Sequence, residues 1–304
     1  MRIFGKRRYV VLAFALLVIF WGSSFAVVKV GLGYSSPLLF AGLRSLTGGL
    51  AMILVAILWG GSPSLRRDWL VFLLLALFNV ALFIGFQTYA IVYLPSGSAA
   101  VLVYLQPILV GLLAWPILGE RLTVAKVVGL VLGFSGIVAV SAGSFSGSVG
   151  ALSPLGVTFG ATSALCWALG TVFFKRYEAR VPTLWAVAVP FVAGGAVLTA
   201  VGLLVESWEG ITWNRPFVAS MLYSGVIGIS LTWVIWFALV RAGEASRVAS
   251  YIFAVPLTAV LIGVLFLDEP LGYTLLIGAA FVVSGIYLVN REPRSKKGAG
   301  TLSA

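Results

Sequence analysis

The sequence predicts an all-α integral membrane protein in which ten transmembrane helices form two inverted five-helix repeats. The first observation is composition: hydrophobic residues make up 61% of the 304 positions, charged residues only 10%, and the mean hydropathy is +1.11, which excludes an ordinary soluble protein. The second is that the uncharged segments are about one or two times the roughly 20 residues that span a bilayer. The third is a set of residues that recurs in the same order in both halves.

The uncharged segments set the positions of the helices. Two of them, 69–119 and 127–174, are of double length, so each holds two helices joined by a turn. The turns are expected at "YLPSGS" and at the Gly/Ser-rich "SAGSFSGSVG". The first helix follows basic residues, as a secretory signal does, but it is long for a signal and further spans follow, so we expect it to be retained. The ten helices are expected at 9–28, 37–58, 69–90, 97–117, 123–141, 154–174, 182–205, 217–240, 247–267 and 271–289.

The net charge of +11 predicts orientation in a membrane rather than binding to nucleic acid. When alternate helix ends are assigned to the two sides, 17 of the 20 Lys and Arg residues fall on one side. Only Lys29 and Arg215 fall on the other side, and Arg44 lies within a helix. The positive-inside rule then predicts a multi-pass protein of the plasma (inner) membrane with both termini in the cytoplasm.

The two halves correspond at nearly constant spacing, about 146 positions in their early parts and 149 in their later parts. A repeat unit of five helices, an odd number, enters the membrane from the opposite side in its second copy, so the halves are inverted. The matched residues are Trp21, Lys29, Pro37, Gly48, Gly49, Ala100, Pro107, Glu120, Leu122, Gly129 and Ser135 with Trp167, Lys175, Pro182, Gly194, Gly195, Ala249, Pro256, Glu269, Leu271, Gly278 and Ser284.

The repeat divides the chain into five segments. They are a cytoplasmic N-terminal segment 1–8, a first repeat 9–141, a Gly/Ser-rich linker 142–153, a second, inverted repeat 154–290 and a basic cytoplasmic tail 291–304. Inverted repeats are a transporter architecture, because exchanging the conformations of two similar halves exposes one midplane site to each side in turn.

Several motifs carry a resemblance to a known family. They are "WGSSF", "FAGLRSL", "YLQPILVGLLAWPILGERLT" and its echo "YIFAVPLTAVLIGVLFLDEPL", each of the last two followed by a helix with "SGI". On these motifs the chain, over residues 9 to 290, resembles the EamA family of the drug/metabolite transporter superfamily, and within it is most similar to YddG-type exporters of amino acids. The resemblance implies a basket of helices one to four and six to nine around a central cavity, with helices five and ten at the periphery.

Two tryptophans are the first candidates for a binding site. Trp21 shares a helix face with Ser24, and Trp167 has the equivalent place on the sixth helix, which runs the other way. The two indoles are therefore expected on opposite sides of the midplane, where they could bracket a substrate. The alternative is that Trp21 is packing and that Ser23 and its small neighbours only let helices approach closely.

Arg44 is the one basic residue that lies well inside an expected span. It could attract a carboxylate as a bidentate donor. It could instead extend its side chain to the membrane surface, which its depth permits.

Polar and aromatic residues inside the other spans complete the candidate site, since polar groups there are costly unless they face a cavity or a partner. Asn79, Phe83, Phe86 and Gln87 are expected on one stripe of the third helix. Aromatic walls with scattered hydrogen-bonding groups are typical of a small-molecule pocket. The remaining candidates are Tyr104, Thr171, Trp233, Trp236 and Tyr251, and Pro107 and Pro256 are candidate hinges, although their kinks could also be static.

All nine carboxylates fall in loops or at expected helix ends. Proton-driven antiporters commonly use a buried acid or histidine as a relay, and this chain has no histidine. We therefore predict transport that is not driven by a membrane-embedded carboxylate, by facilitated diffusion of neutral or zwitterionic solutes such as amino acids. A proton path through Glu120, Glu244 or bound substrate stays open as an alternative.

Other functions are less compatible with these residues. With one cysteine, no histidine and no carboxylate within an expected span, the chain lacks the groups of metal-dependent, His-assisted and paired-aspartate hydrolysis. We expect no enzymatic activity, no cofactor, no metal and no nucleic acid, and a monomer whose partners are a small-molecule substrate and the lipid bilayer. The alternative carrier is a proton-coupled multidrug or other metabolite exporter of the same superfamily.

Overall fold

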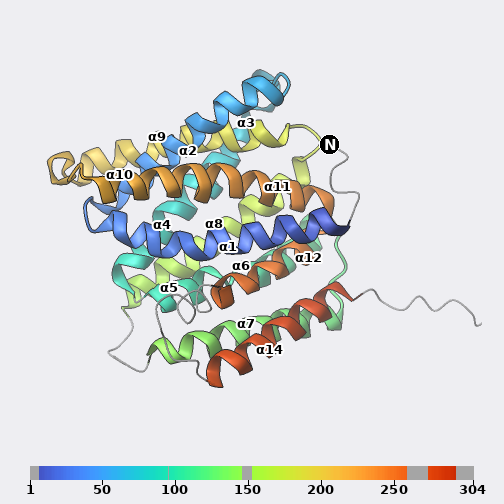
Figure 1. Cartoon of the computed structure of the whole chain (residues 1–304). Coiled ribbons are helices and arrows are strands. Elements are labelled where there is room, and N and C mark those ends of the chain that lie inside the picture. Colours follow the sequence, from blue (N-terminus) through green and yellow to red (C-terminus); the bar gives the residue numbers. More distant parts are fainter. Residues whose placement is uncertain (1–6, 95, 146–152, 259–272, 292–304) are drawn as a thin grey trace, which may run out of the picture.

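The structure is a bundle of helices lying roughly side by side (Figure 1). The computed structural model describes residues 7–94, 96–145, 153–258 and 273–291, and in these ranges it contains helices and no strands. Seven of its helical segments are long and apolar enough to cross a membrane, and two shorter apolar helices, Val124–Ala139 and Leu276–Asn290, accompany them. The all-α prediction is confirmed, and the arrangement as ten spans in inverted halves stays a prediction.

The first half follows the expected order. Its first two spans are single helices, whereas the third and fourth are each built from more than one segment. The segments are α1 (Arg7–Leu32), α2 (Pro37–Trp59), α3 (Leu65–Leu75), the π-helix η2 (Ala76–Leu82), α4 (Phe83–Tyr93), α5 (Ser96–Val103), α6 (Gln106–Leu118) and α7 (Val124–Phe145).

The second half repeats this pattern of continuous and segmented helices. Its segments are α8 (Pro154–Tyr177), α9 (Thr183–Val205), the 3-10 turn η3 (Trp208–Gly210), α10 (Arg215–Leu222), the π-helix η4 (Tyr223–Leu231), α11 (Thr232–Ala242), α12 (Ala245–Ser250), the 3-10 turn η5 (Tyr251–Phe253) and α14 (Tyr273–Asn290). The expected span 247–267 is described only as far as Thr258. Its remainder, with Asp268 and Glu269, lies outside the described residues.

Helix starts are satisfied by polar groups that the sequence supplies nearby. The Asn214 side chain accepts a hydrogen bond from Phe217 N at 2.9 Å and caps α10. The carboxylate of Glu206, at the end of α9, accepts hydrogen bonds from Leu38 N and Leu39 N at 2.9 and 3.0 Å. The negative charge of Glu206 also interacts favourably with the positive, N-terminal end of the α2 dipole. Glu206 therefore holds the start of α2 against the end of α9.

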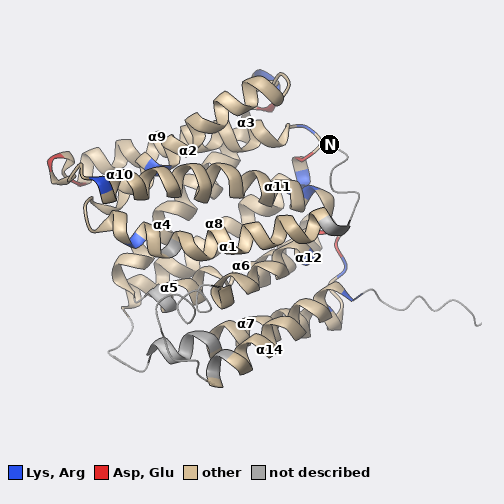
Figure 2. Cartoon of the chain, viewed as in Figure 1, with Lys and Arg blue, Asp and Glu red and all other residues tan. Residues whose placement is uncertain are grey.

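Charged residues gather toward the ends of the helices, and the helix interiors are almost free of them (Figure 2). We call the end where α1 begins and where α2, α6, α8 and α11 end the basic end, because most of the described Lys and Arg residues belong to it. Lys29 and Arg215 belong to the opposite end. Which end faces the cytoplasm stays a prediction.

Two helix pairs are held together by direct backbone contact. α2 packs along α9, and α7 packs along α14 at one edge of the bundle (Figure 1). A Cβ added at Gly49 would lie 2.6 Å from Val192 N, and one added at Gly195 would lie 2.8 Å from Leu46 N. Only glycine permits this approach, as small residues commonly do between membrane helices.

Enlarging these glycines is expected to destabilise the protein. Gly49→Ala and Gly195→Ala should each lower the free energy of unfolding by about 1–3 kcal/mol, because the new methyl group must push back the backbone of the facing helix. The measurement is the thermal unfolding midpoint of the purified protein in detergent. Gly210→Ala is the control, since an added Cβ there has nothing within 4 Å. If all three variants unfold at the same temperature, the contact between α2 and α9 is not as close as described.

Candidate substrate cavity

A cavity of about 60 Å³ lies in the middle of the bundle, among α1, α2, α4, α5, α8, η4 and α11. Small-molecule pockets usually have roughly 300–1,000 Å³, so the cavity is contracted in this conformation. It is lined by Trp21, Ser24, Val28, Arg44, Phe83, Ile84, Gln87, Ile91, Val103, Tyr104, Trp167, Gly228, Ile229 and Trp233.

The structure brings eight of the twelve predicted binding residues to this cavity. They are Trp21, Ser24, Arg44, Phe83, Gln87, Tyr104, Trp167 and Trp233. The sequence analysis missed the apolar part of the wall, which includes Ile84, Ile91, Val103 and Ile229. No signal could have found these residues, because apolar side chains occur at most positions of every span.

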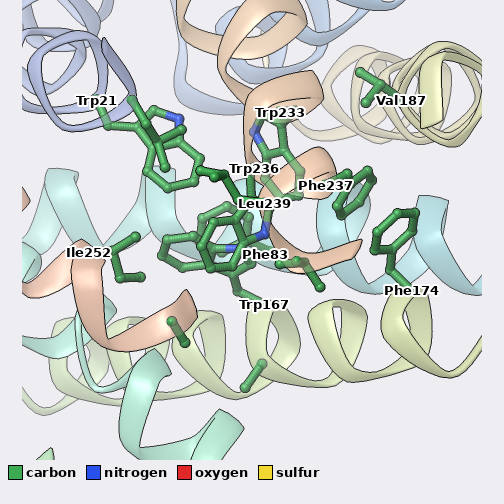
Figure 3. Close-up of a cluster of buried hydrophobic side chains, with 14 of the residues drawn as sticks. Trp21, Phe83, Trp167, Phe174, Val187, Trp233, Trp236, Phe237, Leu239 and Ile252 are labelled. Atoms are coloured by element: carbon green, nitrogen blue, oxygen red, sulfur yellow. The ribbon is translucent and has the colours of Figure 1, made fainter. Parts of the chain in front are cut away.

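Four tryptophans fill the bundle beside the cavity. Trp21, Trp167, Trp233 and Trp236 converge from α1, α8 and α11, with Phe83 of α4 among them (Figure 3). Phe83 stacks on Trp167 with ring centroids 4.9 Å apart, and Trp236 lies 5.7 Å from Trp21 and 5.9 Å from Trp167. Aromatic pairs of this kind contribute about 0.5–1.5 kcal/mol each beyond the burial of their surface.

Trp21 and Trp167 do not bracket a substrate in this conformation, and their placement on opposite sides of the midplane stays a prediction. Their rings meet edge to face, with centroids 5.3 Å apart and planes at 82°. The helices α1 and α8 lie close enough for the two indoles to touch directly. A substrate ring can enter between them only if the helices or the indoles move.

Arg44 lies among the walls of the cavity rather than at the membrane surface. Its side chain comes from the second turn of α2, and the residue is only 6% exposed. Its Nε and Nη2 are buried without a hydrogen-bond partner, and none of the ion pairs among the described residues includes it. The structure therefore decides against the extended, surface-seeking side chain.

On the third span Asn79, Phe83 and Phe86 all contact α8, and only part of the expected stripe reaches the cavity. The π-helix η2 ends at Leu82 and shifts the rotation of the residues that follow it. Phe83 and Gln87 line the cavity, whereas Phe86 stacks on Phe159 at 5.7 Å. Asn79 is 1% exposed and packs against Gly170 of α8, where a Cβ would lie 2.0 Å from its Oδ1.

Three further predicted residues also lie away from the cavity wall. Thr171 donates a hydrogen bond to Trp167 O at 2.9 Å and accepts one from Gln106 Nε2 at 3.2 Å. Trp236 is fully buried in the tryptophan cluster, and the Tyr251 ring packs on Phe14 at 4.2 Å. These residues pack outside the layer of side chains that lines the cavity.

Both candidate hinges follow an interruption of a helix. Pro107 is in the first turn of α6, directly after the break at Tyr104 and Leu105 that separates α5 from α6. Pro256 is in the helical residues that follow the 3-10 turn η5. A role in movement stays a prediction.

A network of charges connects the loops at the basic end. The Glu120 carboxylate accepts hydrogen bonds from Ala245 N at 2.5 Å and Ser246 N at 3.1 Å, and so caps the start of α12. Lys126 Nζ lies 2.7 Å from a Glu244 oxygen and 3.9 Å from a Glu120 oxygen. These contacts join the loop after α6 to the loop before α12.

Glu244 is the acid of this network with a shifted pKa. Burial raises its pKa, but the hydrogen bond and charge of Lys126, together with Arg247, outweigh burial and hold it below the ordinary value of 4.5. A carboxyl whose pKa is lowered by folding stabilises the folded state above its unfolded pKa, and this stabilisation is lost as the pH falls through the folded pKa.

Acid should therefore weaken the network at the basic end. Glu244→Gln is expected to unfold at a lower temperature than the native chain near pH 7, and the difference should shrink as the pH is lowered to about 3. Thermal unfolding in detergent at both pH values measures the effect. Glu209→Gln, an exposed acid with no ion pair among the described residues, should show no such difference. A constant gap at both pH values would contradict the role of the Glu244 charge.

A multi-pass helical membrane protein with an aromatic cavity in mid-bundle has the architecture of a small-molecule transporter. Comparison with known families agrees. The chain belongs to the EamA-like transporter family, because the model of that family matches residues 8–142 and 154–291. Members of this family are transporters and not enzymes.

Individual relatives are similar over almost their whole length. The transporter YvbV of Bacillus subtilis is 42% identical over 288 residues, which cover 95% of this chain and 93% of that protein. A protein of Salmonella typhimurium named "Probable amino-acid metabolite efflux pump" is 28% identical over 90% of this chain and 92% of its own length. A solved crystal structure, 23% identical, has the same fold with a TM-score of 0.80 and covers 94% of this chain and 97% of that chain.

Proposed function

We propose that the protein is a facilitator that exports small neutral or zwitterionic metabolites, including aromatic amino acids, across the plasma (inner) membrane by alternating access. The observation that carries this proposal is a cavity whose walls combine aromatic rings with a few polar groups and whose described lining residues include no carboxylate. The name of the Salmonella typhimurium relative supports amino acids as cargo.

Alternating access needs two similar halves, and the packing supports an inverted repeat. Positions 49 and 46 of the first half correspond to 195 and 192 of the second at a spacing of 146. The contact of Gly49 with Val192 and that of Gly195 with Leu46 are therefore the same contact with the halves exchanged. Such an exchange is what a two-fold axis in the membrane plane produces.

The segmented helices support the same relation. The π-helices η2 and η4 interrupt the third and eighth spans and begin 147 positions apart, at Ala76 and Tyr223. The breaks before Pro107 and Pro256 likewise recur in the fourth and ninth spans. Each of these interruptions thus has a counterpart in the other half. The counterpart could bend when the carrier is in the opposite state. We propose that the ten spans form these two halves and that a monomer suffices.

The placement of acids supports transport without an embedded proton relay. Six of the nine carboxylates lie in the described part of the chain, and each belongs to a helix end or a loop. Most already have basic or backbone partners there. Asp68 pairs with Arg67 and Arg180, Glu178 with Lys175, Glu120 and Glu244 with Lys126, and Glu206 caps α2. A proton that drove transport would have to act through one of these end groups or through the substrate.

Transport by the purified protein in liposomes tests this proposal. We expect saturable uptake and counterflow of labelled amino acids, including phenylalanine and tryptophan, that do not change when a pH gradient is imposed. Trp21→Ala should reduce uptake at least about tenfold, because an indole that stacks on the substrate is lost. Trp59→Ala is the matched control, since this indole is 73% exposed and does not line the cavity.

Two results would contradict the proposal. Uptake that rises with the pH gradient would favour a proton-coupled exporter and direct attention to Glu120 and Glu244. Transport of organic cations with no transport of amino acids would favour a multidrug exporter.

A further inference from the structure

Arg44 is a buried cation without a counter-charge among the residues that the structure describes. Its Nε and Nη2 have no hydrogen-bond partner, the residue is 6% exposed, and it lines the cavity. An isolated charge in a low-dielectric interior is strongly unfavourable. Such a side chain is expected where an occupant of the cavity supplies the missing negative charge.

The described residues near Arg44 do not supply that charge. The described lining of the cavity contains no Asp or Glu. Glu206, at the end of α9, uses both of its oxygens for Leu38 N and Leu39 N at the start of α2. The cavity therefore presents one free guanidinium, and guanidinium groups bind carboxylates through two parallel hydrogen bonds.

The other walls limit what else the occupant can carry. Phe83, Trp167 and Trp233 present apolar ring surfaces, which suit an aromatic or branched apolar body. The described lining offers an ammonium group no anion with which to pair. A phosphate dianion would require more than the single positive charge that the lining provides.

We propose that Arg44 is the carboxylate-binding residue of the site, and that the protein recognises its cargo by a carboxylate and an apolar ring while the amino group contributes little. The inference rests on the proposed transport function and changes its substrate class: the cargo must carry a carboxylate, and it can be an anion as well as a zwitterion. It adds to amino acids their counterparts without an ammonium group, such as 2-oxo, 2-hydroxy and N-acyl acids with aromatic side chains. The carboxylate then points toward the end of the bundle opposite the basic end, because Arg44 lies near the start of α2.

Three compounds with the same phenyl ring separate the contributions. 3-Phenylpropionate carries only the carboxylate, 2-phenylethylamine only the ammonium group, and phenylalanine both. Each is titrated into the full-length protein in detergent, and binding is read from the rise of the unfolding midpoint. We expect 3-phenylpropionate and phenylalanine to bind with affinities within about threefold of each other, and 2-phenylethylamine and inorganic phosphate to produce no shift.

Variants of Arg44 test the residue itself. Arg44→Gln should weaken binding of 3-phenylpropionate at least about tenfold, because charge-assisted hydrogen bonds are lost, and Arg44→Lys should recover part of it. Without ligand, Arg44→Gln should unfold at the same or a higher temperature than the native chain, because it removes an unpaired buried charge. Arg215→Gln, an exposed arginine at the same end of the bundle, should bind as the native chain does.

Several outcomes would overturn the inference. Two concern the native chain with other ligands: stabilisation by 2-phenylethylamine, or stabilisation by phosphate in place of 3-phenylpropionate. The others are equal binding of 3-phenylpropionate by the native chain and Arg44→Gln, and no binding of either carboxylate by the native chain. Flux is measured separately in liposomes with the same compounds. Arg44-dependent binding without flux would contradict the transport proposal and leave carboxylate recognition intact. Flux that is equal in the native chain and in Arg44→Gln would contradict carboxylate recognition by Arg44 and leave the transport proposal intact.

Discussion

Lipid cannot hydrogen-bond to a peptide group, and this constraint governs the whole molecule. Every backbone N–H and C=O within the bilayer needs a partner inside the protein, so the described spans are helical. Departures from the α-helix, such as η2 and η4, still bond internally and lie where other helices cover them. With little hydrophobic force between helices in lipid, close backbone contacts such as Gly49 with Val192 hold the bundle together.

The same constraint decides what could be read from the sequence. A span must be long and apolar, so its position is visible in the distribution of charges, and the described helices lie close to the expected ranges. The rotation of a helix about its axis is harder to predict from the sequence. Asn79 and Phe83 both face α8, but Phe83 lines the cavity whereas Asn79 packs against Gly170. The distance between Trp21 and Trp167 depends on conformation, which composition and spacing do not encode.

The charged groups of the basic-end loops and the one charged residue of the cavity lining have different surroundings. At the basic end, Glu120, Lys126 and Glu244 satisfy one another and the start of α12. In the cavity, Arg44 has no such partner among the described residues. The loop network at the basic end thus pairs its acids with Lys126, whereas the guanidinium of Arg44 is left for an occupant of the cavity to bind.

The tryptophan cluster has a further consequence for the membrane in which the protein resides. A membrane that stores energy as an ion gradient would lose that energy through a continuous file of water in a carrier. The four indoles and Phe83 occupy the middle of the bundle in mutual contact, and the cavity beside them holds only about 60 Å³. In this conformation the packed aromatic rings leave little space for water in the middle of the bundle.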